Sequence, residues 1–559
     1  MNKKMRLWNK LTLISLALIL VLTACASNTK KEEASKAPPA SVAPSPSEKA
    51  EEPEEAAKGG ELTYALATSP DLLDPHVSRV AVSVRVLRTI YDSLVVQDAD
   101  GSIKPWLATE WELAPDSKSY TFKLRKDVKF HDGTPFNAEA VKYNFDRILD
   151  PTTKAANAAA LIRPYVSSDI IDEFTIKLNL ATPSADFLGN LSQALVGIVS
   201  PTAAKKFGDQ FGRNPVGSGP FKFVKWDDNA QINVERNPDY NWGPSNVDNK
   251  SAANLDTISF KIIPEEATRL GSVQSNQVQA AESIPPQNIL SLKKEDKLQL
   301  LQVNTNGLPY TLFINQRKKP WNELKARQAL QYGIDVTTIV QTLYLGTYEQ
   351  AWSPISPGLL GYDKSLENGI KLDIDKANSL LDEIGWVKGK DGLREKDGKK
   401  LTLHYVDSSP NREKRNDIAA IVQQQLKKIG ITVEVEITKD VLNSVFVKDG
   451  YDIFGNSQTN SDPNALFAFY HSLVKIVGGG NIPGVLDPEL DDLLNKGAVE
   501  QDNTKRVEIY KQAQQLIINK AYIIPIYVFP YTVAASKTVT GLKFDALGYP
   551  LFNDVSITK

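Results

Sequence analysis

The chain has 559 residues, of which 42% are apolar, with 65 basic against 67 acidic side chains. A chain of this length predicts more than one core-forming unit, because a domain usually holds about 100–200 residues. The near balance of charge excludes a broad nucleic-acid-binding surface, which would carry an excess of Lys and Arg. A single Cys excludes intrachain disulfides, thiolate metal cages and iron–sulfur ligation.

The first 24 residues have the pattern of a secretory signal peptide. Four Lys and Arg residues come before a mainly apolar run of 14 residues at positions 11–24. This run is too short for a membrane-spanning helix, which needs about 20 apolar residues, and fits the apolar region of a signal peptide. The residues that end it, Leu22-Thr23-Ala24-Cys25, resemble the lipobox of bacterial lipoproteins, whose Cys is acylated after cleavage.

We therefore expect residues 1–24 to be removed and Cys25 to anchor the protein by acyl chains to the outer face of the cell membrane. The alternative is an ordinary signal peptide with an incidental Cys. Residues 25–60 are rich in Ala, Pro, Ser, Glu and Lys, and after Cys25 their only large apolar residue is Val42. Such a composition cannot bury enough surface to offset chain entropy, so we expect a disordered tether.

Strand-like and helix-like segments alternate irregularly from residue 61 onward. Alternating apolar and polar side chains predict strands over residues 61–67, 119–124, 175–180, 231–236, 257–262, 310–315, 401–405 and 432–437. Helical spacing of apolar residues predicts helices over 83–93, 138–149 (with Asn137 as N-cap), 325–345, 375–384, 413–429 and 506–517. Asp-Gly turns at 391–392 and 397–398 predict hairpins. The expected fold class is α/β with antiparallel elements.

Roughly 500 folded residues exceed what a single hydrophobic core supports, so we predict two lobes. Two segments suit the crossings between them: residues 304–309, which are polar and contain Gly and Pro, and residues 522–526, which precede a last apolar strand. If both are hinge strands, the first lobe is discontinuous and holds residues 61–303 and 524–559. The second lobe then holds residues 304–523.

Motifs of catalysis are missing from the sequence. It contains no HExxH metalloprotease motif, no Walker A loop and no GxGxxG dinucleotide loop. Gly217-Ser218-Gly219 lacks the spacing of a nucleophile elbow, because Val216 stands where a Gly is needed. Four scattered His leave little for a His-built metal site. The sequence therefore favours a binding protein over an enzyme, and no cofactor or metal is predicted.

Residues 101–147 and their flanks carry the most specific pattern in the chain. Its pieces are Leu73-Asp74-Pro75, Tyr91-Asp92-Ser93-Leu94, Leu107-Ala108, Trp111, Tyr120-Thr121-Phe122, Val128-Lys129-Phe130-His131-Asp132-Gly133, Ala138-Glu139-Ala140-Val141, Arg147, Arg236-Asn237-Pro238, Leu312-Phe313-Ile314-Asn315 and Asp462-Pro463. In this order they resemble the family 5 extracytoplasmic solute-binding proteins, the dipeptide, oligopeptide and nickel receptors of ABC importers. The resemblance covers nearly all of residues 61–559.

This resemblance implies a two-lobed periplasmic-binding-protein-like fold of type II, cluster C. The fold would have two hinge strands and an extra subdomain at about residues 95–214 inserted in lobe one. It also implies that an oligopeptide or another polar organic solute is captured between the lobes and delivered to ABC permease subunits. We expect a monomer that binds no nucleic acid and touches the membrane only through its anchor. The alternatives are a signalling or adhesion lipoprotein, a nickel-chelate receptor and an extracytoplasmic hydrolase.

The resemblance also suggests which loop meets the solute. Peptide receptors of the family fix the α-amino group of their ligand with an Asp in the loop that follows Tyr451-Asp452. With Asp462-Pro463 aligned to the family's Asp-Pro, Thr459 takes the place of that Asp, so the ammonium anchor is missing unless Asp462 serves. The candidate residues are Ser457, Gln458, Thr459, Asn460 and Asp462. A neutral polar loop of this kind suits an uncharged or hydroxyl-bearing ligand.

Family topology adds candidates from other loops that border the expected cleft. They are His76, Ser78 and Arg79 after Leu73-Asp74-Pro75, Tyr310 and Asn315 near the first crossing, and Tyr348 and Trp352 after Gly346. Any aromatic side chain among them is as consistent with the core as with a ligand surface.

Overall fold

The computed structural model describes residues 58–476 and 480–558. The predicted signal peptide, Cys25 and the tether up to residue 57 lie outside the described residues. The chain joins the fold at Gly59, whose amide donates to the carbonyl of Asn254 (2.7 Å), and at Gly60, whose amide donates to the carboxylate of Asp256 (2.8 Å). The last residues assigned to the tether are therefore already part of the folded chain.

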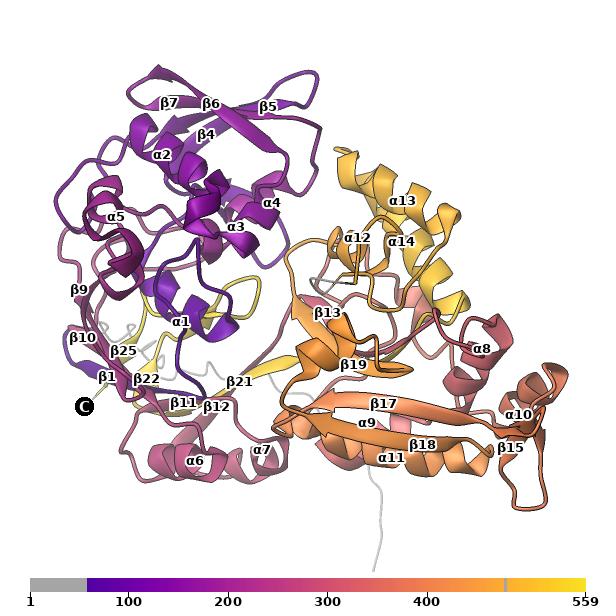
Figure 1. Ribbon diagram of the computed structural model, residues 1–559. Helices are drawn as coiled ribbons and strands as arrows, with labels where there is room; N and C mark the ends of the chain where they lie inside the picture. Colours follow the sequence, from indigo (N-terminus) through magenta and orange to yellow (C-terminus); the bar gives the residue numbers. More distant parts are fainter. Residues whose placement is uncertain (1–57, 477–479, 559) are drawn as a thin grey trace, which may run out of the picture. The chain divides into compact units, whose positions relative to one another are not determined.

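A seven-stranded sheet forms the base of the N-terminal half (Figure 1). Its strand order is β12 (Leu298–Asn304), β21 (Pro530–Ser536), β11 (Ala280–Glu282), β1 (Glu61–Leu66), β10 (Thr257–Ile262), β9 (Gln231–Arg236) and β8 (Phe221–Asp227). The strand β1 runs parallel to both β10 and β11, and the remaining pairs are antiparallel. After its first residue β1 is buried throughout, as expected of a central strand with parallel neighbours.

A separate four-stranded antiparallel sheet lies between β1 and β8 in the sequence. Its order is β4 (Ala108–Leu113), β5 (Ser119–Leu124), β7 (Thr175–Leu180) and β6 (Tyr165–Asp172). The predicted strands 119–124 and 175–180 are confirmed to the residue, because alternation with one buried face marks such strands clearly. Helix α2 (Ala138–Leu149) is confirmed too, and its N-cap Asn137 accepts a hydrogen bond from the Ala140 amide (3.0 Å).

A five-stranded mixed sheet organises the C-terminal half. Its order is β18 (Thr432–Thr438), β17 (Thr402–Ser408), β19 (Ile453–Thr459), β13 (Gly307–Ile314) and β20 (Ile523–Tyr527). Helices α9 (Val336–Tyr344) and α11 (Arg415–Lys428) lie along one face, as Figure 1 shows. Helices α12 (Ala465–Tyr470), α13 (Pro488–Val499) and α14 (Asn503–Asn519) cover the other face, so β13 is buried along its whole length.

The remaining elements are short helices, turns and hairpins. The other α-helices are α1 (Ala81–Ile90), α3 (Ala156–Leu161), α4 (Phe187–Leu191), α5 (Pro201–Phe207), α6 (Glu266–Gln274), α7 (Pro286–Leu292), α8 (Leu324–Gly333) and α10 (Ile374–Glu383). Small sheets pair β2 (Val95–Gln97) with β3 (Ile103–Pro105), β22 (Val539–Thr540) with β25 (Ser556–Ile557), and β23 (Lys543–Phe544) with β24 (Pro550–Leu551). The predicted hairpins are confirmed as β14 (Val387–Lys388), β15 (Arg394–Lys396) and β16 (Lys399–Lys400).

One helix prediction is wrong. The single helix expected over residues 325–345 is two helices, α8 and α9, which are separated at Ile334 and Asp335. The side chain of Asp335 caps α9 by accepting a hydrogen bond from the Thr338 amide (2.9 Å). A residue that satisfies the first free amides of a helix starts a new one, which apolar spacing alone does not reveal.

The chain passes between the seven-stranded and five-stranded sheets twice. The first crossing joins β12 to β13 through Thr305 and Asn306, within the segment predicted from the sequence. The second joins β20 to β21. The sequence placed the lobe boundary at residue 524. Because β20 lies wholly in the five-stranded sheet, the crossing between the sheets instead lies between Tyr527 and Pro530.

Four hydrophobic clusters form the core. One cluster packs against the seven-stranded sheet, a second packs against the four-stranded sheet, and a third lies beneath α12–α14. The largest contains side chains from both sides of the crossings, among them Ile289 and Leu292 of α7, Leu312 of β13 and Ala534 of β21. The two main sheets therefore share apolar packing at the crossings.

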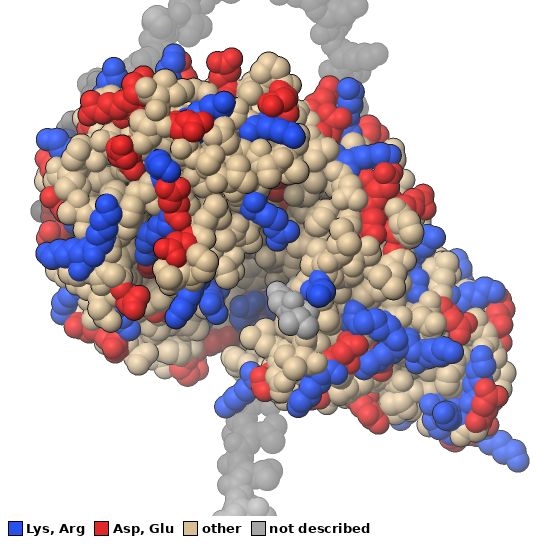
Figure 2. Space-filling view, turned by 45° about the horizontal axis from the view of Figure 1, so that its top comes forward, with Lys and Arg blue, Asp and Glu red and all other residues tan. Residues whose placement is uncertain are grey.

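Among the described residues, none of the helices has the length and apolar character that a membrane crossing requires. Acidic and basic side chains are interspersed over the face shown in Figure 2, and Lys and Arg side chains stand at the rim of a hollow in that face. The interspersion agrees with the near-zero formal net charge of −2.

The Gly217-Ser218-Gly219 loop gives a test of the packing. A Cβ at Gly217 would lie 2.1 Å from the carbonyl oxygen of Ile90 at the end of α1, and backbone cannot move aside cheaply. We expect Gly217→Ala to lower the free energy of unfolding by about 2 kcal/mol or more in denaturant titration. Gly271→Ala is the control, because nothing lies within 4 Å of its Cβ in α6. Equal stability of the two variants would contradict the described loop.

Candidate functional site

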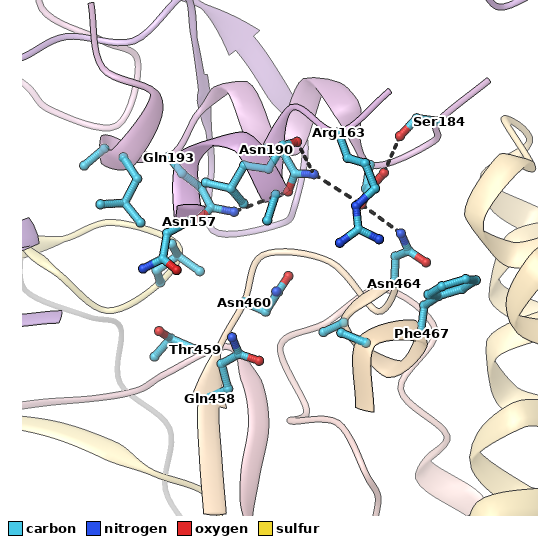
Figure 3. A pocket seen from close by; sticks show the side chains of 18 of the residues that line it. Asn157, Arg163, Ser184, Asn190, Gln193, Gln458, Thr459, Asn460, Asn464 and Phe467 are labelled. Carbon is cyan, nitrogen blue, oxygen red and sulfur yellow. Dashed lines mark hydrogen bonds between the residues drawn. The ribbon is translucent and has the colours of Figure 1, made fainter. Parts of the chain in front are cut away.

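A cavity of about 610 Å³ is lined by segments that lie far apart in the sequence. They are residues 79–88 around the start of α1, residues 157–195 beside the four-stranded sheet, residues 458–468 after β19, residues 498–499 at the end of α13 and residues 545–549 near the C-terminus. Figure 3 shows Arg163 and Gln193 on one side, facing Gln458 and Asn460 on the other. Parts of the chain on both sides of the two crossings therefore contribute side chains to one polar cavity, which is also called the chamber below.

The loop after β19 is held in place by the first crossing. Gly307 pairs with Thr459, and the Asn460 amide donates to the carbonyl of Asn306 (2.9 Å). Gly307 has φ +136°, and a Cβ there would lie 2.1 Å from the Gln458 carbonyl oxygen. Only Gly permits this approach, and it brings Gln458, Thr459 and Asn460 to the cavity wall.

Direct hydrogen bonds join the two sides of the cavity. The Ala185 amide donates to the carbonyl of Ala498 (2.9 Å), and Asn464 Nδ2 donates to Asp186 Oδ2 (2.9 Å). Thr459 Oγ1 and the hydroxyl of Tyr549 lie 3.3 Å apart. These contacts link the two sides of the cavity directly.

The charged residues of the described lining are three Arg and two Asp. Arg88 and Asp545 pair with each other at 3.7 Å, and their side chains are only 7% and 8% exposed. Burial raises the pKa of Asp545, and the Arg88 guanidinium opposes that rise. Amides of Leu547 and Tyr549 also donate to the Asp545 carboxylate (2.9 Å each). The Arg88–Asp545 ion pair is therefore a structural part of the cavity wall, because both of its charges already have partners within the protein.

Asp186 accepts three hydrogen bonds, all from neutral side chains. Its carboxylate accepts hydrogen bonds from Ser184 Oγ (2.5 Å), Asn190 Nδ2 (3.2 Å) and Asn464 Nδ2 (2.9 Å). In Figure 3, Ser184 and Asn190 lie on the upper side and Asn464 lies on the lower side. Asp186 therefore links the two sides and has little capacity left for a ligand.

Arg79 and Arg163 differ from the other charged residues of the lining. Both are exposed residues that line the cavity. Within residues 58–476 and 480–558, neither guanidinium has a recorded hydrogen bond or ion pair. The rest of the polar lining is amide-rich, with Asn157, Asn190, Gln193, Gln458, Asn460 and Asn464. Such a wall offers donors and acceptors together with two free positive charges.

Four of the candidates named from the sequence line this cavity: Arg79, Gln458, Thr459 and Asn460. The structure places His76 and Ser78 behind the wall, both with no exposed surface. Arg147 donates to Nδ1 of His76 (2.7 Å), while Nε2 lies 3.1 Å from the carbonyl oxygen of Gly197. Burial and the Arg147 charge lower the pKa of His76 to about 4. His76 is thus a neutral core residue.

Tyr310 and Asn315 are likewise buried away from the cavity. The Tyr310 ring stacks on Tyr527 (5.0 Å between centroids), and its hydroxyl donates to Asp407 (2.8 Å). Asn315 Nδ2 donates to Asp449 (2.8 Å). These residues belong to β13 and its end, where both faces of the sheet are covered.

Ser457 and Asp462 flank the cavity loop but turn away from it. Arg415 donates to Ser457 Oγ (2.9 Å). Asp462 receives two hydrogen bonds from Arg506, at 2.7 and 2.6 Å, and the Arg506 side chain is 3% exposed. Asp462 is therefore engaged by Arg506 and is not among the residues that line the cavity.

Trp352 lines a different cavity of about 240 Å³, beside α8 and α9. Tyr348 stacks on Tyr344 at 4.3 Å between ring centroids and takes no part in either chamber. Six further lining residues were not predicted from the sequence: Arg163, Asp186, Asn190, Gln193, Asn464 and Tyr549. Asn464 follows Asp462-Pro463 directly, so the loop pattern could have found it. Nothing local marks the others as cavity residues, because the fold brings their segments together.

A metal site is not supported by the described residues. They include no group of three or more His, Cys, Asp or Glu side chains placed to hold a metal ion. None of the described residues that line the cavity of 610 Å³ is a His.

Comparison with known proteins gives consistent matches. The model of the family described as "Bacterial extracellular solute-binding proteins, family 5 Middle" matches residues 102–476. The chain is 30% identical over 512 residues to the probable D,D-dipeptide-binding periplasmic protein DdpA of Escherichia coli, covering 89% of this chain and 94% of the relative.

Two solved structures extend the comparison to the fold. AgaA of A. tumefaciens, in complex with agropinic acid, has a TM-score of 0.73 at 28% identity and covers 89% of this chain and 99% of its own. NikA of Brucella suis, in complex with Fe(III)-EDTA, has a TM-score of 0.79 at 25% identity and covers 89% and 100%. These matches confirm the predicted two-lobed α/β fold.

The structural role of Asp462 can be tested directly. Asp462→Asn removes one charge and leaves the buried Arg506 guanidinium without its counter-ion, so we expect the free energy of unfolding to fall by about 3 kcal/mol. Asp492→Asn is the matched control, because Asp492 pairs with Lys496 on the surface at 59% exposure, where an ion pair contributes little. If both variants unfold at the same denaturant concentration, the Asp462–Arg506 pair is not structural.

Proposed function

The chain belongs to the family 5 bacterial extracellular solute-binding proteins, and on this basis we propose that it is the lipid-anchored receptor of an ABC importer. It captures a peptide-like or other polar organic solute between its lobes and delivers it to the permease subunits. Its relatives are solute-binding proteins and not enzymes. The mechanism is capture by lobe closure, a hinge motion about the two crossings, without a chemical step.

The observation that carries this proposal is the amide-rich cavity of about 610 Å³. Parts of the chain on both sides of the two crossings line it. Its volume lies in the range of about 300–1,000 Å³ that small-molecule sites occupy. Six Asn and Gln side chains line it, and each offers both a donor and an acceptor. Such groups suit the amides, hydroxyls and carbonyls of a polar organic solute.

A nickel chelate is the less favoured ligand. The relatives bind different solutes: the probable ligand of DdpA is a D,D-dipeptide, whereas AgaA holds agropinic acid and NikA holds Fe(III)-EDTA. Membership in the family therefore does not identify the ligand, and the chemistry of the ligand is inferred from the residues that line the cavity. Among the described lining residues no His is available to complete a metal's coordination, which favours an organic solute.

The family and the N-terminal sequence support the location that we propose. The family is extracytoplasmic, and the segment ending at Leu22-Thr23-Ala24-Cys25 fits a lipoprotein signal. We propose that the mature protein starts at Cys25, acts as a monomer, and is held at the outer face of the cell membrane by acyl chains. Residues 26–57 then act as the tether that lets the lobes reach the permease.

A thermal-shift screen of residues 26–559 tests the receptor function. The panel holds dipeptides, oligopeptides, sugars, other organic acids and nickel chelates. A specific ligand at a hundredfold excess over its Kd stabilises the folded state by about 2.7 kcal/mol, and we expect such a shift within one organic class. A flat response to every class, with no ligand seen by native mass spectrometry, would reject the receptor proposal.

The anchor has its own test. Cys25→Ser removes the acylated side chain, so we expect the full-length protein to move from the membrane fraction to the soluble fraction on cell fractionation. The folded part is unchanged, and its melting temperature should equal that of the unaltered protein. Retention of the variant in the membrane fraction would show that Cys25 is not the anchor.

A further inference from the structure

The charges of the cavity wall are unevenly satisfied. Both carboxylates are already engaged by the protein: Asp545 by Arg88 and two backbone amides, and Asp186 by three side-chain donors. Arg88 also donates to Ser93 Oγ (3.0 Å) and to the carbonyl of Ser192. Two positive charges of the wall, on Arg79 and Arg163, are left without a counter-charge among the described residues.

Both guanidinium groups are exposed, so water hydrates them while the cavity is empty. A ligand that displaces this water removes hydration from a guanidinium, and that loss is costly unless the ligand brings a compensating group. A ligand that brings an anionic group restores the balance and forms charge-assisted hydrogen bonds, which are shorter and about twice as strong as neutral ones. Arginine suits this role because its planar donors match a carboxylate in a two-point contact.

A free ammonium group would meet no carboxylate that lacks partners among the described lining residues. Asp186 already accepts three hydrogen bonds, Asp545 is buried against Arg88, and Asp462 pairs with Arg506 outside the lining. At the loop position where peptide receptors of the family are expected to carry an Asp, Thr459 contributes a neutral hydroxyl. Beyond these engaged carboxylates, the described lining offers an ammonium group only neutral acceptors, the oxygens of amides and hydroxyls.

We propose that the solute carries at least one carboxylate or similar oxyanion, bound by Arg163 together with Arg79, and has no free ammonium group. This inference rests on the proposed receptor function and narrows its ligand to N-blocked or amine-free organic acids. The amides of Gln193, Gln458 and Asn460 then bind the neutral polar remainder of the solute. Specificity for charge comes from the side of the chamber that holds α1 and the four-stranded sheet.

Matched ligands test the charge preference. A panel of dipeptides is prepared in four forms: N-acetylated acid, N-acetylated C-terminal amide, free dipeptide acid and free dipeptide amide. We expect the N-acetylated acids that bind to do so at least tenfold more tightly than their amides and than the free dipeptides, by calorimetry. Equal affinity of acid and amide, tighter binding of the free dipeptides, or no binding of any acid overturns the inference.

Variants assign the preference to residues. Arg163→Gln should weaken the acids about tenfold and leave the amides unchanged, and Arg79→Gln should act in the same direction. The matched control is Arg213→Gln, which removes the same charge from a surface pair with Asp228 outside the cavity. Loss of acid binding in the control, or unchanged acid binding in Arg163→Gln, contradicts the assignment.

A gain-of-function variant separates this inference from the receptor function. Thr459→Asp places a carboxylate in the lining, so ligands with a free amino group should gain affinity relative to their acetylated forms. If the panel shows a neutral or ammonium-bearing ligand for the unaltered protein, the charge inference fails and the receptor function stands. Only the flat response across all solute classes described above would reject both.

Discussion

The hydrogen bonds that Asn464 and Ala498 make across the cavity depend on one buried ion pair, Asp462 with Arg506. The two terminal nitrogens of the Arg506 guanidinium donate hydrogen bonds to the carboxylate of Asp462. The remaining nitrogen, Nε, donates to the carbonyl of Gly497 (2.9 Å). Arg506 thereby fixes both the loop after β19 and the end of α13. Those two segments supply Asn464 and Ala498, which bond to Asp186 and Ala185 across the chamber. Burial opposes the charge of Arg506, but Asp462 outweighs it and raises the pKa of the guanidinium.

The wall of the chamber shows how the protein separates structural from available charge. Arg88 in the lining and Arg506 outside it each have a carboxylate partner, and each joins segments that border the cavity. Arg79 and Arg163 stand on the exposed side of the same wall. The difference lies in the partners that surround each guanidinium and not in residue type, because all four are Arg. A solute that completes the unpaired half of this pattern would also favour the closed arrangement of the lobes.

The sequence predicted regular elements better than it predicted the site. The strand over 175–180 and the helix over 138–149 were placed to the residue, because alternation and the cap at Asn137 are local signals. The site depends on segments that meet only in the fold. His76 follows a family motif and was expected in a loop that borders the cleft. In the fold it is a core residue, because its ring is buried and Arg147, which lies far along the chain, donates a hydrogen bond to it. Arg163 has no local feature that marks it, whereas Gln458, Thr459 and Asn460 were found because the family resemblance locates their loop.

The hydrophobic cluster that spans the crossings has a consequence for unfolding. Side chains of α7, β13, α9 and β21 pack in one continuous cluster, so residues of both main sheets lose contacts together when it opens. The four-stranded sheet, by contrast, has its own cluster and antiparallel pairings between nearby segments. Melting is therefore expected to join the two main sheets in a single cooperative transition, with the four-stranded sheet able to melt as a separate calorimetric domain. Cooperativity in this molecule then follows shared apolar packing and not the boundary between the lobes.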